Sequence, residues 1–170
     1  MRLVALHPEL LGEAEAMAQA LLCDVSFETV AEEVEAALRL PGLDELNERA
    51  GSSRWGYTSP DEAAWELLEE ALQPFVDEMK RYLGLGMAEP ALEMCQGILL
   101  GLYRLRDARD HEVLAWAPEF PLETATTVLK TWSQGGRAKD SASRDSGRVR
   151  TLPAKFVAKH LPEWQGLFGE

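Results

Sequence analysis

The chain has 170 residues, of which 46% are hydrophobic and 27% are charged. This length and composition predict one globular unit that closes its own hydrophobic core. The 29 acidic and 17 basic residues give a net charge of −12, which disfavours nucleic acid as a partner for most of the surface. No apolar run approaches the roughly 18 residues of a membrane span, so we expect no membrane segment.

Cysteine usage and the N-terminal residues favour a cytoplasmic location. Two cysteines, Cys23 and Cys95, are too few for a disulfide framework, and both fall within apolar helical patterns. The first apolar run is interrupted at His7 and Pro8, which makes it too short for the core of a signal peptide. We therefore expect a reducing compartment.

Two amphipathic helices are expected first, over residues 8–24 and 26–38. Pro8 suits the first position of a helix. Apolar residues follow it at helical spacing, namely Leu10, Leu11, Ala14, Met17, Ala18, Leu21 and Leu22. Ser26 resembles an N-cap, and the second apolar stripe ends where Pro41 and Gly42 break the helix. A short helical turn is expected over residues 43–50.

A loop is predicted next, because residues 51–58 show no periodicity and are rich in Gly and Ser. Arg54, Trp55 and Tyr57 lie in this segment, and they are of the residue types enriched at binding hot spots. We take these three as candidate partner-binding residues. The alternative is that Trp55 and Tyr57 pack against the helix that follows.

A long helix pair is predicted over residues 59–106. Its start has a serine suited to the N-cap, a proline at the first helical position and a capping-box glutamate, within residues 59–62. Pro74 lies inside the first helix and predicts a kink near Glu70 or two abutting helices. Gly84 and Gly86 are expected to end it.

The second helix of the pair, over about residues 90–106, is apolar in nearly every direction. A helix that is apolar all round is buried all round, so we expect it to be the central helix of the core. Gly97 and Gly101 lie four positions apart, on one side of it. Their missing side chains predict a close approach by another helix.

Further helices are expected over residues 111–117 and 121–134, which completes an α-helical domain at residues 1–134. Residues 135–150 have almost no apolar side chain and predict a flexible basic linker. Residues 151–170 are expected to form a C-terminal helical segment that docks on the domain. No segment alternates like a strand, so we predict an all-α fold, either a right-handed superhelical or a bundle-like arrangement around residues 90–106.

The helix pair also carries features of a helical repeat. Tyr82, Gly86 and Ala91 match the tyrosine, the turn glycine and the small residue of a tetratricopeptide unit, whereas Phe75 and Ile98 depart from it. Residues 75–102 therefore resemble an α-α hairpin of the tetratricopeptide or HEAT type, without indicating a specific family. The resemblance implies a superhelical surface suited to protein binding.

Catalytic, metal and cofactor sites are not predicted. The three histidines, His7, His111 and His160, lie far apart without metal-ligand spacing. The carboxylates between Glu62 and Glu70 lack the Glu-x-x-His motif of metal-binding bundles and indicate a solvated helix face. The glycines near residue 85 lack the features of a phosphate-binding loop. We expect Cys95 to be a core residue and His111 a solvated or capping group.

We therefore expect a non-catalytic helical scaffold or adaptor that binds another protein, with no cofactor and with self-association left open. Two alternatives remain. One is an enzyme whose site leaves no local motif. The other is a nucleic-acid accessory protein that uses the stretch between Lys130 and His160, which has eight basic and two acidic residues.

Overall fold

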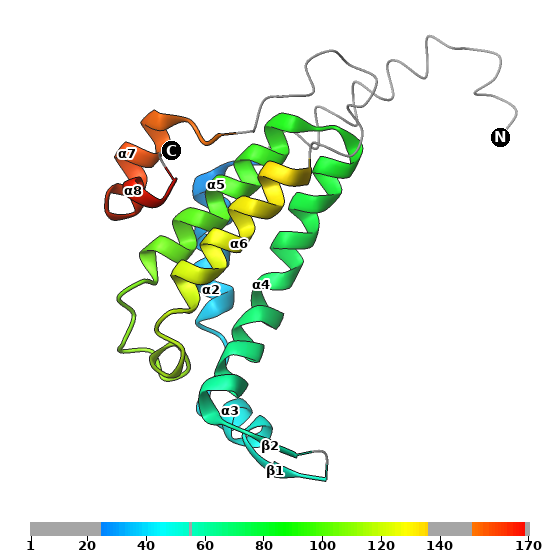
Figure 1. Ribbon diagram of the computed structural model, residues 1–170, viewed down its shortest axis with the longest axis vertical. Coiled ribbons are helices and arrows are strands. Elements are labelled where there is room, and N and C mark those ends of the chain that lie inside the picture. The colour runs from blue at the N-terminus through cyan, green and yellow to red at the C-terminus, as the bar shows by residue number, and fades with distance from the viewer. Residues whose placement is uncertain (1–24, 55, 136–150, 169–170) are drawn as a thin grey trace, which may run out of the picture.

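The computed structural model describes residues 25–54, 56–135 and 151–168 (Figure 1). Helices dominate these residues, and the only sheet among them has two short strands, so the predicted all-α fold is confirmed. The helix expected over residues 8–24 lies outside the described residues. The same holds for the expected linker, apart from Gly135, which ends a helix.

Helix α5, Ala88–Arg104, is the centre of the core. Every residue from Met94 to Tyr103 is buried, which confirms the expectation of a helix buried on all sides. It contacts α2, Phe27–Leu38, α4, Pro60–Leu85, and α6, Phe120–Gly135. The thiol of Cys95 lies inside this core, with no exposed surface.

Two glycines allow α2 to lie directly against α5, as their spacing predicts. A Cβ atom built on Gly97 would lie 2.4 Å from the Cβ atom of Val30. One built on Gly101 would lie 2.7 Å from Cγ1 of Val34. The two valines therefore occupy the space that side chains at the glycines would fill.

The start of α2 is held by a different contact from the one predicted. Ser26 is the N-cap residue, but its hydroxyl donates to the carboxylate of Glu28 at 2.9 Å and does not cap the helix. A carboxylate oxygen of Glu93, on α5, accepts from the backbone N–H of Phe27 at 2.9 Å. This bond ties the first turn of α2 to the central helix.

Helix α4 runs unbroken through Pro74, so the alternative of two abutting helices is wrong. Its N-cap is as predicted, because the Ser59 hydroxyl accepts from the Glu62 backbone N–H at 3.4 Å. Its end is at Gly86, whose φ of 76° is a left-handed conformation suited to glycine. Gly84 lies inside the last turn. The connection to α5 is therefore short, and the two helices form an α-α hairpin.

Residues 51–53 and 56–58, within the segment predicted as a loop, form an antiparallel hairpin. Strand β1, Gly51–Ser53, pairs with β2, Gly56–Thr58, with Ser52 opposite Tyr57. Strands of three residues are too short to show an alternating pattern, so no strand could be predicted here. The preceding helix α3, Leu43–Arg49, is tied to α4 by Arg49, which donates to both carboxylate oxygens of Glu70 at 2.8 Å.

The helix expected over residues 111–117 is reduced to one 3₁₀ turn, η1, Leu114–Trp116. Before it, Nε2 of His111 donates to the carbonyl oxygen of Arg39 at 2.9 Å. Arg39 is the C-cap residue of α2, so His111 caps that helix end, one of the two roles expected for it.

The C-terminal residues form α7, Ala154–His160, η3, Pro162–Trp164, and α8, Gln165–Phe168. Two edge-to-face ring contacts join them to the bundle. Trp164 lies 5.1 Å from Tyr103 of α5, and Phe156 lies 5.3 Å from Phe27 of α2, measured between ring centroids. None of the described helices is long and apolar enough to cross a membrane.

Candidate functional site

The candidate residues Arg54 and Tyr57 lie on the β1–β2 hairpin. Arg54 is exposed at its turn, and Tyr57 on β2 is 68% exposed. Trp55 lies outside the described residues. The exposure of Tyr57 contradicts the alternative in which its ring packs against α4.

A groove lies between the first turns of α4 and the end of η1 with the residues that follow it. Its volume is about 390 Å³. Its lining side chains, which define the acidic–aromatic groove, come from Asp61, Glu62, Trp65, Glu66, Trp116 and Glu119. Only three residues separate Tyr57 from Asp61, so hairpin and groove share one end of the molecule, away from α7 and α8 (Figure 1).

The two tryptophans differ in how firmly they are held. Trp65 is half-buried, meets Phe120 edge to face at 5.1 Å, and donates its indole N–H to Glu69 at 3.1 Å. Trp116 is 49% exposed. One indole is therefore fixed in the wall of the groove, and the other is about half-exposed to solvent.

The charge of the groove is negative. Glu66 lies 3.6 Å from the guanidinium of Arg49, a residue already bound to Glu70. Within residues 25–54, 56–135 and 151–168, no cation forms an ion pair with Asp61, Glu62 or Glu119. Asp61 and Glu62 also face the positive end of the α4 dipole, which offsets part of their charge. The remaining negative potential favours cationic groups.

The described residues do not bring together the parts of a catalytic or metal site. No three His, Cys, Asp or Glu side chains among them gather closely enough to hold a metal ion. Burial raises the pKa of the Cys95 thiol far above its usual value, so the thiol stays protonated. His111 is bound to a backbone carbonyl, and its Nδ1 atom is buried without a partner in the described part of the chain.

Comparison with known proteins adds no assignment: no family model, no curated protein and no solved structure matches this chain. The residues described above are therefore the only guide to its function. Of these, sequence reasoning singled out Arg54 and Tyr57 but missed Trp65, Trp116 and Glu119.

Proposed function

We propose that this chain is a non-catalytic protein-interaction domain whose acidic–aromatic groove binds a basic segment of a partner protein. The observation that carries the proposal is the groove itself, in which four carboxylates surround one fixed and one half-exposed tryptophan. The cytoplasm remains the compartment we expect for it.

The chemistry of the groove suits arginine and lysine side chains. The face of an indole attracts a cation with about 0.5–2 kcal/mol, depending on how far the cation is desolvated. A guanidinium stacked on Trp116 would place its N–H groups within the negative field of Glu119 and the α4 carboxylates. Each exposed ion pair contributes little alone, so a segment with several basic residues is the ligand that fits.

The hairpin would extend the contact. Tyr57 and Arg54 are exposed and are of residue types that contribute strongly at protein interfaces, which supports a role for them as partner-binding residues. The resemblance of residues 75–102 to helical-repeat hairpins supports the same kind of function. The first helix of that hairpin, α4, also supplies one wall of the groove with its first turns.

An arginine-rich peptide tests the proposal. We expect it to quench or shift the fluorescence of the native protein saturably, because Trp116 would lie under a guanidinium. Glu119→Lys should weaken binding by about 10-fold or more, since a repulsive charge then faces the ligand. The matched control is Glu112→Lys, which makes the same charge change at an exposed position outside the groove.

The control decides between a site and a general charge effect. An equal loss of affinity in both variants would mean that the peptide responds to net charge, and the groove would then have no role. Tighter binding of a single-stranded oligonucleotide than of the peptide would instead favour the nucleic-acid alternative. Trp116→Ala should lower affinity while leaving the melting temperature nearly unchanged.

A further inference from the structure

A second groove opens between the start of α2 and the middle of α4. It has a volume of about 360 Å³. Its apolar lining, which defines the apolar groove, comes mainly from Val25, Val30, Pro74, Phe75 and Met94, with Thr29 at its edge. Val30 and Met94 are buried beneath it, whereas Pro74 and Thr29 are exposed.

The first residues that the structure describes lie at this groove. Val25 and Ser26 are the first described residues, and both line it. The preceding segment is therefore covalently joined to a residue that lines the groove. This segment, residues 8–24, has the apolar stripe of an amphipathic helix, which would be about 25 Å long at 1.5 Å per residue.

The apolar stripe of such a helix is stable in water only when another apolar surface covers it. An isolated helix of this length is marginal in water, because its stability comes mostly from packing of its apolar face. A tether of one or two residues gives the segment a high effective concentration at the adjoining apolar surface. We propose that residues 8–24 form a helix whose apolar stripe docks in the apolar groove of the same chain.

The contact would be apolar, not electrostatic. The groove's polar rim carries Glu33 and Glu78, and the segment is itself acidic, with Glu9, Glu13 and Glu15. Glu78 is paired with Arg81, which lowers the pKa of its carboxyl and neutralises part of its charge. The remaining like charges oppose docking weakly, so burial of the leucines must drive it.

Amide hydrogen exchange of the full chain tests this proposal. We expect amides of residues 10–22 to exchange at least about 10-fold more slowly than in an unstructured peptide. Thr29→Trp fills the groove from its edge and should abolish this protection. Glu32→Trp, three residues further along α2 at an exposed position outside the groove, is the matched control and should retain it.

Variants in the segment itself give the reciprocal test. Leu21→Asp places a charge in the apolar stripe and should abolish protection, whereas Gln19→Asp, on the opposite face of the expected helix, should not. Circular dichroism and the melting temperature of each variant would establish that α2 and α4 remain folded.

Three outcomes would overturn the proposal. The first is exchange of residues 10–22 at the rate of an unstructured peptide in the native protein. The second is protection that persists in Thr29→Trp, since the segment would then pack elsewhere. The third is protection that rises with protein concentration together with a dimer in solution, because the occupant would then be a second copy. None of these depends on the acidic–aromatic groove.

Discussion

Gly97 and Gly101 set the distance between α2 and α5. At Gly97 the obstacle to a side chain is the Val30 Cβ atom and, at 2.9 Å, the backbone oxygen of Phe27. Backbone atoms cannot rotate out of the way, so a methyl group there must push the two helices apart. Gly84 of α4 offers a contrast, since a Cβ atom built on it meets nothing within 4 Å.

These two positions predict opposite effects of the same substitution. Gly97→Ala should destabilise the fold by about 1–3 kcal/mol through overpacking. Gly84→Ala should be neutral or stabilise it by up to about 1 kcal/mol, because alanine favours the helix. Urea denaturation midpoints measure both changes. A Gly97→Ala protein as stable as its parent would mean that α2 does not lie against α5 as described.

The close approach of α2 could be predicted from the spacing of Gly97 and Gly101, because residues four apart on one helix lie on the same side of it. The acidic–aromatic groove could not be predicted, because its walls come from residues 61–66 and 116–119, which only the fold brings together. The sequence alone places Glu62 and Glu66 on a solvated helix face. They are on such a face, but Trp116 makes it one wall of a groove.

Among the elements, the long helices were predictable from the sequence, whereas the short helix at residues 111–117 and the hairpin were not. Long amphipathic patterns identified α2, α4, α5 and α6 to within a few residues. The β1–β2 hairpin lacks any pattern of that length. Its signal was glycine alone: Gly51 and Gly56 have φ values of 113° and 140°, which suit glycine at strand ends. Glycine marks turns of many kinds, so it did not indicate pairing.

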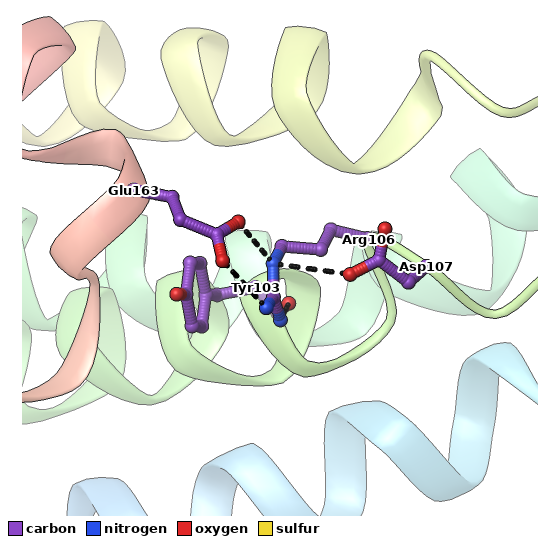
Figure 2. A network of polar contacts seen from close by, with 4 residues as sticks. All are labelled: Tyr103, Arg106, Asp107 and Glu163. Carbon is purple, nitrogen blue, oxygen red and sulfur yellow. Dashed lines mark hydrogen bonds and ion pairs between the residues drawn. The ribbon is translucent and has the colours of Figure 1, made fainter.

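The C-terminal elements meet α5 through one polar cluster (Figure 2). Arg106 donates to both carboxylate oxygens of Glu163, at 2.7 and 3.0 Å, and its guanidinium lies 4.1 Å from the centroid of the Tyr103 ring. Asp107 lies 3.4 Å from the same guanidinium. The Arg106 hydrogen bond lowers the pKa of the Glu163 carboxyl. The cluster thus links η3 to the end of the central helix.

This lowered pKa gives the contact a pH dependence with a definite sign. A carboxyl whose pKa is lower in the folded state contributes stability above its unfolded pKa and loses it as pH falls through the folded value. The Trp164 indole NMR signal should therefore move as the pH falls from about 6 to about 3. Glu163→Gln should remove that movement, and Glu112→Gln should not. A response unaffected by Glu163→Gln would assign it to other carboxyls.

The two grooves of the molecule differ in the chemistry of the ligands that they suit. The acidic–aromatic groove lies near the hairpin, and the apolar groove lies against the middle of α4. The acidic–aromatic groove attracts cations over a distance through its negative charge. The apolar groove stabilises a ligand only when apolar surfaces are in contact. The net charge of −12 strengthens the first effect and opposes the second for an acidic segment.

Salt should therefore separate the two proposals. Raising the salt concentration from about 0.05 to about 0.5 M shortens the Debye length and should weaken binding of the arginine-rich peptide by about 10-fold. Protection of residues 10–22 should stay constant or increase, because screening reduces the like-charge repulsion. Peptide titrations and hydrogen exchange at the two salt concentrations measure this. Parallel weakening of both would contradict the apolar nature of the second contact.

The buried thiol of Cys95 can be used to measure how often the native structure unfolds. An alkylating reagent reaches this sulfur only after α5 has separated from the helices around it. Because α5 contacts α2, α4 and α6, that separation amounts to loss of the whole bundle. Once Cys23 is replaced by serine, the alkylation rate of the native protein reports how often the entire fold comes apart.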